Sequence, residues 1–251
     1  MNEERFSGKA EIYKKFRPSY PKELFDYLYS QAGFRKESVI ADIGAGTGIF
    51  TRLLLERGST VYAVEPNGDM RGTAEQDLAE YKKLKLIDAP AEKTGLADAS
   101  VDFITVAQAF HWFDRDLFKS ECQRILKPGG KVVLVWNERD YESEIVKKDY
   151  DIRKKYAADN KGIGRYGGFR HDYLNFFADG IYEYKTFNND LQFDKESFTG
   201  RNLSASYAPR EEKDPEKYQG LVRELGEFFD EYSVNGILNY PHYTQSFAGN
   251  I

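Results

Sequence analysis

The sequence has 251 residues and a formal net charge of -5 at pH 7, and this acidic balance argues against nucleic acid as the main partner. With 41% hydrophobic and 15% aromatic residues it can bury a core, yet no apolar run approaches the length of a membrane span. The single cysteine, Cys122, excludes an internal disulfide and a cysteine-rich zinc site. The N-terminus lacks the apolar stretch of a signal peptide, so we expect a cytoplasmic protein. We also expect that it binds no metal.

The first helix is expected just after a polar N-terminal segment. Apolar residues recur at helical spacing from Leu24, and the helix is expected to stop near Gly33. Pro21 suits the first turn of this helix, with Ser19 or Tyr20 near its cap.

A strand, a glycine turn and a helix follow in succession. The strand over Val39–Asp42 leads into Gly44, Gly46 and Gly48, and the apolar residues of Ile49–Leu55 have helical spacing. Glycine tolerates positive φ and has no Cβ, so a ligand can lie against the bare backbone of such a turn. The N-terminus of the helix also offers it free N–H groups.

A second buried strand, Val61–Val64, ends at Glu65, and Pro66 stops it. Glu65 follows Gly48 at close to the ~20-residue spacing that separates a glycine turn from a ribose-binding acid. A carboxylate can accept two hydrogen bonds from a vicinal diol. A ribose role is therefore favoured over an exposed acid at a strand end.

Further strands alternate with helices, which indicates a parallel sheet. Strands are expected over 84–88, 102–107 and 131–136, and helices over 69–83 and 117–126. The fourth strand delivers Gln108–Asp114, and the fifth delivers Asn137–Arg139, to the carboxyl edge of the sheet, where open α/β folds bind ligands.

The amino-acid pattern changes after residue 137, where the regular alternation of strands and helices ends. Residues 143–180 are charged and aromatic with a glycine-rich patch, helices are expected over 197–207 and 215–232, and strands over 181–193 and 236–247. We predict one domain over 1–251. Its parts are a lid segment at 1–20, a cofactor-binding core at 37–137 and cap insertions at 138–180 and 195–233. For Arg17–Pro21 the alternative to a lid over the cofactor is a rigid lead-in to the first helix.

The glycine spacing departs from the Gly-x-Gly-x-x-Gly of NAD-binding folds. With Asp42 before it, the turn resembles the first motif of class I S-adenosylmethionine-dependent methyltransferases. Ala91-Glu92 and the run Leu126–Gly130 resemble further motifs of that family, although Pro90 stands where the family usually has aspartate. The resemblance implies a Rossmann-like α/β fold: a seven-stranded, mostly parallel sheet with the last strand antiparallel, helices on both faces and an α-helical cap.

The resemblance also implies the cofactor, S-adenosylmethionine, with S-adenosylhomocysteine as product. Its implied binding residues are Asp42, Gly44, Ala45, Gly46, Glu65, Pro66, Met70, Ala91, Glu92 and Gln108. Asp42, Gly44, Gly46 and Gln108 are expected at the methionine part, Glu65 at the ribose and Met70 against the adenine. Glu92, Asp88 and the backbone are alternatives for holding adenine N6.

Three other stretches are similar to a small-molecule branch (type 11) that includes the trans-aconitate methyltransferase-like and the ubiquinone/menaquinone-biosynthesis-like enzymes, with the former closer. They are Arg17–Pro21, Ala107–Phe113 and Val135–Asn137. The branch implies a small-molecule acceptor, with a carboxylate or hydroxyl oxygen favoured. The expected acceptor residues are Tyr13, Arg17, Tyr20, His111, Trp112, Asn137 and Arg139, and an acid-binding clamp could draw on Arg17, Arg139, Arg165, Arg170 and Arg201.

Two questions stay open at this level. His111 is either a general base for a hydroxyl or amine, or an aromatic-cluster residue that shapes the pocket floor. An NAD-dependent oxidoreductase and a non-catalytic S-adenosylmethionine-binding module are the alternative functions. The acceptor atom and the choice between monomer and homodimer are not determined by the sequence.

Overall fold

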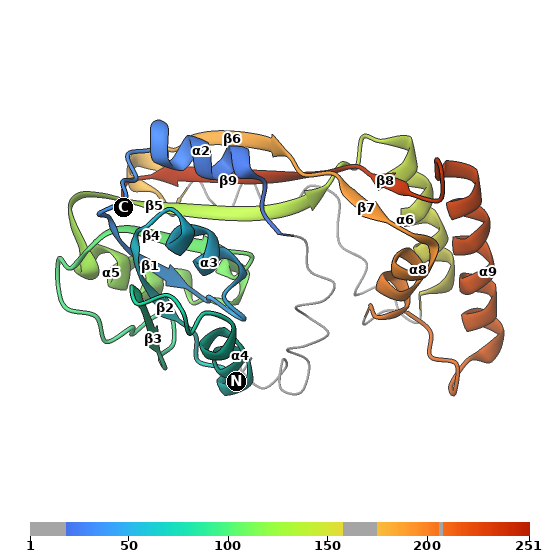
Figure 1. The fold of residues 1–251 in the computed structure, drawn as a ribbon, viewed down its shortest axis with the longest axis horizontal. Coiled ribbons are helices and arrows are strands. Elements are labelled where there is room, and N and C mark those ends of the chain that lie inside the picture. Colours follow the sequence, from blue (N-terminus) through green and yellow to red (C-terminus); the bar gives the residue numbers. More distant parts are fainter. Residues whose placement is uncertain (1–18, 158–174, 206–207) are drawn as a thin grey trace. The chain divides into compact units, whose positions relative to one another are not determined.

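The computed structural model describes residues 19–157, 175–205 and 208–251. The described chain forms two compact units (Figure 1). The sheet unit comprises 19–137, 175–187 and 244–251, and the helical unit comprises 138–157, 188–205 and 208–243. The glycine-rich patch, Arg165, Arg170 and most of the predicted lid segment lie outside the described residues.

The sheet unit is built on seven strands in the order β3-β2-β1-β4-β5-β9-β6 (Figure 1). Their bounds are β1 Val39–Ile43, β2 Thr60–Val64, β3 Leu84–Ile87, β4 Val101–Ala107, β5 Leu126–Arg139, β6 Glu183–Asn188 and β9 His242–Gly249. The strand pairs β1–β2, β1–β4, β2–β3 and β4–β5 are all parallel. The last strand in the chain, β9, runs antiparallel to its neighbours (Figure 1). The predicted fold class is confirmed.

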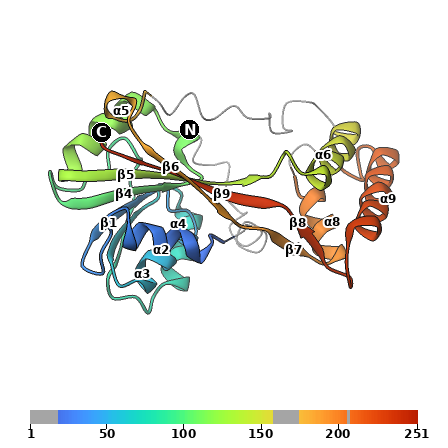
Figure 2. The ribbon, with the colours of Figure 1, turned by 90° about the horizontal axis from the view of Figure 1, so that it is seen from above.

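Helices cover both faces of this sheet (Figure 2). Their bounds are α2 Lys22–Ser30, α3 Ile49–Glu56, α4 Gly68–Asp77 and α5 Arg115–Ile125. Because successive strand residues point to opposite faces, Ile40 packs with α2 and α3 while its neighbour Ala41 packs in the α5 cluster. Strand order reverses between β1 and β4, and this is the switch point at which such sheets bind ligands.

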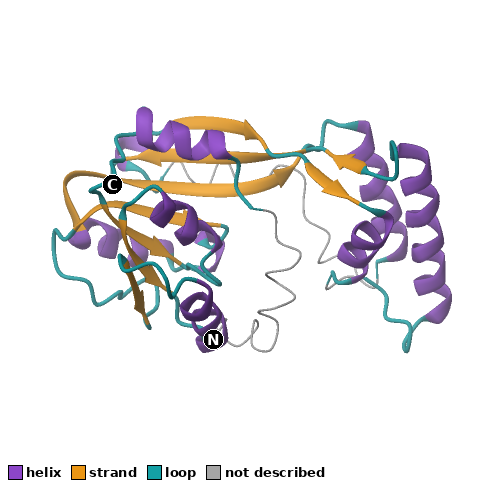
Figure 3. Cartoon of the chain, in the orientation of Figure 1, coloured by secondary structure: helices purple, strands orange, loops and turns teal. Residues whose placement is uncertain are grey.

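The helical unit has its own apolar core. It contains α6 Glu144–Tyr156, α8 Lys195–Leu203 and α9 Pro215–Tyr232, with an antiparallel pair formed by β7 Leu191–Phe193 and β8 Leu238–Tyr240 (Figure 3). Phe198, Leu225 and Phe228 are almost fully buried in this core. Asp214 caps α9 by accepting the Lys217 N–H, and Pro215 follows at the first helical position, where its missing N–H costs nothing.

Several predicted boundaries are wrong. The helix expected to reach Lys83 ends at Asp77. The run 181–193 contains two strands, β6 and β7, that belong to different sheets, and 236–247 likewise divides into β8 and β9 on either side of Pro241, which has no N–H to donate. Pro21 is the N-cap of α2, where no side chain caps the helix. None of the described helices is long and apolar enough to cross a membrane.

Candidate active site

The glycine turn joins β1 to α3 at the switch point of the sheet. Gly44, Gly46 and Gly48 all have positive φ, at 70°, 58° and 81°. The N–H groups of Gly44 and Ala45 donate to the Val64 carbonyl at 2.9 and 3.1 Å, so the turn is fastened to the end of β2. The left-handed backbone explains why glycine recurs here.

The three glycines differ in what surrounds them. A Cβ on Gly44 would lie 2.5 Å from the Cβ of Ala109, and one on Gly48 would lie 2.7 Å from a methyl group of Leu78. A Cβ on Gly46 would meet no described atom within 4 Å. Packing against Ala109 therefore requires glycine at 44 and the positive φ favours it at 48, whereas the space beside Gly46 is open to a ligand.

Asp42 is buried beneath this turn, with 1% of its surface exposed. Its two carboxylate oxygens accept hydrogen bonds from the hydroxyls of Thr51, at 2.5 Å, and Thr105, at 2.8 Å. Burial raises the pKa of Asp42 to about 6, against the opposing effect of these two hydrogen bonds, and the nearby Glu65 carboxylate raises it further. Asp42 thus links β1, α3 and β4 directly below the turn.

Glu65 holds the other side of the turn. One of its carboxylate oxygens accepts the Gly46 N–H at 2.9 Å, and the other accepts the Asn67 N–H at 2.9 Å. Asn67 in turn caps α4, since its side chain accepts the Met70 N–H at 3.0 Å. Glu65 therefore fastens the glycine turn to the start of α4.

The residues expected around adenine come from two loops. Met70, on the first turn of α4, is 3% exposed, and Pro66 is half-buried after β2. Ala91 is 5% exposed and belongs to the core cluster that includes Phe110. Glu92 accepts the Asp114 N–H at 2.8 Å, which ties its loop to the start of α5.

Asp88, the other acid considered for adenine N6, forms an ion pair with Arg71 at 2.7 Å. The same guanidinium donates to the Glu65 carbonyl at 2.7 Å. Both candidate acids therefore already have protein partners, and the assignment of the adenine contact stays a prediction.

Gln108 stands at the carboxyl end of β4 with a φ of 60°, an uncommon value for a residue with a side chain. Its backbone N–H donates to the Val135 carbonyl at 2.9 Å, and its amide donates to the Asn137 carbonyl at 3.1 Å. Asn137 extends the network, because its own side chain donates to the Ser19 carbonyl at 3.3 Å and accepts the Thr244 hydroxyl at 2.6 Å.

The segment after Gln108 forms a short 3₁₀ turn, Phe110–Trp112. Phe110 is fully buried, His111 is exposed and Trp112 is half-buried, with the last two rings 4.6 Å apart between centroids. Tyr20 packs edge-on against Phe50 of α3 at 4.9 Å. Tyr13 and Arg17 lie outside the described residues, and Arg139 belongs to the helical unit.

Residues 41–134, from β1 to β5, match the family described as a methyltransferase domain. They include the glycine turn, Glu65, Met70, Glu92 and Gln108. Residues 41–134 are therefore a methyltransferase domain, and the seven-stranded sheet that they help to build has a Rossmann-like methyltransferase fold.

Relatives of this methyltransferase domain occur in other organisms. An uncharacterised methyltransferase of Mycobacterium tuberculosis is 42% identical over 135 residues, which are 54% of this chain and 53% of that protein. The chain thus spans about half the length of the curated relatives it matches.

Two solved structures share the fold. One, named as a type II methyltransferase from Anaeromyxobacter dehalogenans, has 23% identity and a TM-score of 0.66, covering 94% of this chain and 98% of its own. The other is a phosphoethanolamine N-methyltransferase of Haemonchus contortus in complex with phosphomonomethylethanolamine and S-adenosylhomocysteine. It has 18% identity and a TM-score of 0.57, with coverage of 100% of this chain and 59% of its own.

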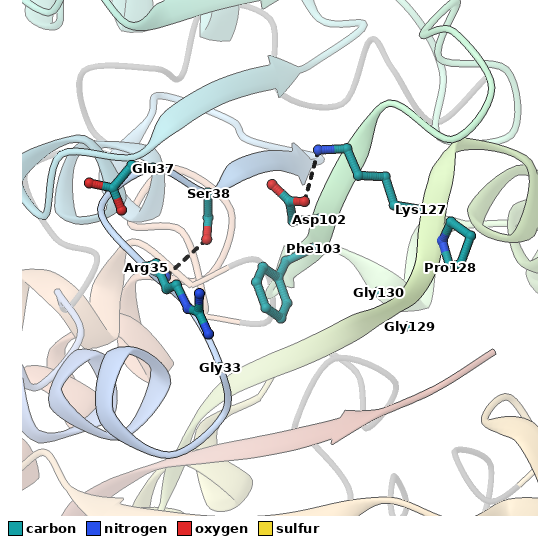
Figure 4. A pocket seen from close by; sticks show the side chains of 10 residues that line it. All are labelled: Gly33, Arg35, Glu37, Ser38, Asp102, Phe103, Lys127, Pro128, Gly129 and Gly130. Atoms are coloured by element: carbon teal, nitrogen blue, oxygen red, sulfur yellow. Dashed lines mark hydrogen bonds and ion pairs between the residues drawn. The ribbon is translucent and has the colours of Figure 1, made fainter.

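The described part of the methyltransferase domain also has a pocket of about 330 Å³ at the opposite edge of the sheet (Figure 4). It is lined by Gly33, Arg35, Glu37, Ser38, Asp102, Phe103 and the loop 127–130. Asp102 accepts the Val39 N–H at 2.7 Å and pairs with Lys127 at 2.8 Å, so these groups join the amino ends of β1, β4 and β5. This pocket is separate from the glycine turn.

Three residues of the site are absent from the sequence-based list. Thr51 and Thr105 hold Asp42, and Asn67 links Glu65 to α4. Asn67 carried a usable signal, because asparagine directly before a helix is a preferred N-cap. The two threonines carried none, since they are brought to Asp42 only when α3 and β4 pack around β1.

Proposed function

We propose that this chain binds S-adenosylmethionine at the glycine turn and transfers its methyl group to a small-molecule acceptor. The observation that carries the proposal is the arrangement of Glu65 and Gly46. The carboxylate holds the Gly46 N–H from one side, while the position of the missing Cβ is open. A carboxylate and bare backbone thus lie side by side at the switch point, as the binding of a ribose beside the turn would require.

The residues present fit this group. Glu65 supplies a carboxylate, the acceptor that suits a ribose diol, and it lies beside the open position at Gly46. Met70, the apolar residue expected against the adenine, lies on the first turn of α4 and is 3% exposed. The half-buried segment from Gly44 to Gly46 gives the methionine part access to backbone groups.

The protein's own contribution is mainly one of position. Asp42, Glu65 and the packing of Gly44 against Ala109 fix the turn, and proximity of correctly aligned groups supplies several kcal/mol of catalysis. When bound, S-adenosylmethionine supplies an electrophilic methyl group, which passes to the acceptor as the carbon–sulfur bond breaks. Gln108 and Asn137 hold the carboxyl ends of β4 and β5 together beside the turn.

We propose an oxygen acceptor, either a carboxylate or a hydroxyl. An ionised carboxylate needs no base, whereas a hydroxyl must lose its proton. His111 is exposed and follows the end of β4 closely in sequence. Its two predicted roles, general base and wall of the site, differ in how the reaction rate would depend on pH. The cap role of 138–180 and 195–233 is part of the same proposal.

The decisive experiment is calorimetry of the intact chain with S-adenosylmethionine and S-adenosylhomocysteine, beside a fluorescence titration with NADH. We expect heat with both sulfur compounds and no NADH binding, and the reverse pattern would favour an oxidoreductase. A screen of carboxylic acids, phenols, quinones and amines with methyl-labelled cofactor then identifies the acceptor class. Cofactor binding without transfer to any acceptor would favour a non-catalytic binding module.

A further inference from the structure

Arg71 joins the ends of two neighbouring strands on the side of the site where adenine is expected. It follows Met70 on α4, and its side chain is 23% exposed. Its Nη1 donates to the Glu65 carbonyl at 2.7 Å, and its Nη2 donates to Oδ2 of Asp88 at 2.7 Å. Hydrogen bonds with a charged donor are roughly twice as strong as neutral ones. Arg71 therefore fastens α4 to the carboxyl ends of both β2 and β3.

Glu65 and Asp88 occupy equivalent places on these two strands. The strands are parallel, with Val64 opposite Ile87, and each acid is the residue that directly follows this pair. The Glu65 N–H also donates to the Ile87 carbonyl at 3.0 Å. The two acids therefore leave the same edge of the sheet about one strand spacing apart, which is roughly 4.8 Å.

The strand order places three parts of the candidate site in a row. The glycine turn follows β1, Glu65 follows β2 and Asp88 follows β3, and the three strands are neighbours in that order. In a nucleoside the base is joined directly to the ribose. A nucleoside with its ribose at Glu65 and its amino-acid part at the glycine turn therefore has its base at the end of β3, beside Asp88.

Asp88 is able to accept a hydrogen bond from such a base. Its side chain is 66% exposed, and its Oδ1 accepts no hydrogen bond from any described residue. The amino group of adenine is a donor, and a carboxylate is purely an acceptor. Glu92, the other candidate acid, is fastened to the start of α5 instead, through the Asp114 N–H.

The contact with Arg71 also fixes the direction in which Asp88 presents this free oxygen. An exposed side chain without a partner samples several rotamers, and ordering it on ligand binding costs free energy. The guanidinium fork holds one carboxylate oxygen in the free protein, so this cost is met before the ligand arrives.

We propose that Arg71 is a positioning residue that sets the preference of the cofactor site for adenine. It orients Asp88, whose Oδ1 accepts the 6-amino group of the base. Through the Glu65 carbonyl it also keeps the first turn of α4, which carries Met70, at the end of β2. This inference rests on the S-adenosylmethionine site proposed above, and it adds the residue that fixes recognition of the base.

The test compares two ligands that differ at that amino group. S-Adenosylhomocysteine carries it, whereas S-inosylhomocysteine has at the same position an oxo group, which cannot donate to a carboxylate. In calorimetry of the intact chain, the wild type should bind the adenine compound about tenfold or more tightly than the inosine compound. Arg71→Gln should bind S-adenosylhomocysteine about five- to tenfold more weakly and S-inosylhomocysteine almost as the wild type does.

Arg57→Gln is the matched control for Arg71→Gln. Arg57 is also a partly exposed arginine of the sheet unit, with 31% of its side chain exposed, and it pairs with Asp26 at 2.6 Å. It lies at the opposite end of α3 from the glycine turn, so its replacement should change neither affinity. A general loss of structure in Arg71→Gln would weaken both ligands alike. The ratio of the two affinities therefore separates positioning from a purely structural role.

A double-variant cycle tests whether Arg71 acts through Asp88. Asp88→Ala should remove most of the preference for adenine, and adding Arg71→Gln to it should change the ratio of affinities no further. Wild-type preference in either single variant, or a wild type that binds both ligands equally, would overturn this inference and leave the cofactor proposal standing. A wild type that binds neither ligand would overturn both.

Discussion

Replacement of Glu65 by glutamine is the sharpest test of the cofactor site. The carboxylate accepts two backbone N–H groups, those of Gly46 and Asn67, each at 2.9 Å. An amide of the same shape has one acceptor oxygen, so its NH₂ group must face one of these two donors. Losing one charge-assisted hydrogen bond costs about 1.5–3 kcal/mol, and we expect a loss of about 2 kcal/mol in the free energy of unfolding.

The effect on ligand binding is expected to be separate from this loss of stability. An amide accepts fewer hydrogen bonds from the ribose diol than a carboxylate, so affinity for S-adenosylhomocysteine should fall by about 10–100-fold, equivalent to about 1.4–2.8 kcal/mol. Urea unfolding measures the first quantity, and calorimetry under conditions where the variant is folded measures the second.

Glu121→Gln is the matched control for Glu65→Gln. Glu121 is also a buried carboxylate of the sheet unit. It accepts the Thr94 N–H at 2.8 Å and pairs with Arg124 at 2.7 Å, away from the glycine turn. Its replacement should reduce stability by a similar amount and leave cofactor affinity unchanged. Wild-type affinity in Glu65→Gln, or an equal loss in both variants, would refute the ribose assignment.

Three further predictions concern the glycine turn and His111. Burial raises the pKa of Asp42 to about 6 from 3.8, so protonation of this carboxyl group stabilises the folded state below about pH 4. This contribution to the free energy of unfolding, about 3 kcal/mol, is lost as the pH rises through 6. Asp42→Asn should remove this pH dependence, which urea unfolding at several pH values measures. Gly46→Ala should lower the free energy of unfolding by only about 1–2 kcal/mol, because of the positive φ, yet abolish cofactor binding measured by calorimetry. In Gly44→Ala the new Cβ overlaps Ala109, so the loss of stability should be about 2–4 kcal/mol by thermal unfolding. If His111 is the base, His111→Gln should lower kcat by about 10²–10⁴-fold and remove the acidic limb of the pH–rate profile. Cofactor affinity should not change. An unchanged kcat would instead assign His111 to the wall of the site.

The order of elements in the sheet unit was predictable because it depends on local patterns. Short apolar runs alternate with segments of helical spacing up to β5, and a right-handed crossover after each strand leaves few ways to arrange them. The predicted strands over 181–193 and 236–247 were wrong, because each of these segments contains two strands that belong to different sheets. Nothing local distinguishes the residues of β6 from those of β7, since the sheet that each strand joins depends on its partners.

The site divides in the same way. The positions of Gly44, Gly46 and Glu65 were predictable, because a left-handed turn requires glycine and the end of a strand fixes where the acid stands. Their partners were not. The hydroxyl of Thr105, 63 residues from Asp42 in the chain, reaches it only through the pairing of β1 with β4.

The sequence by itself determined which backbone segments have special conformations and which side chains end each strand, because these depend on neighbours a few residues away. It therefore sufficed for the fold class and for the family of the turn from Asp42 to Gly48. Only the tertiary structure decided what each polar group contacts. The pairing of Glu65 with Gly46 and the burial that raises the pKa of Asp42 both depend on contacts between distant segments. Side-chain chemistry is set by burial and partners, and both exist only after the chain has folded.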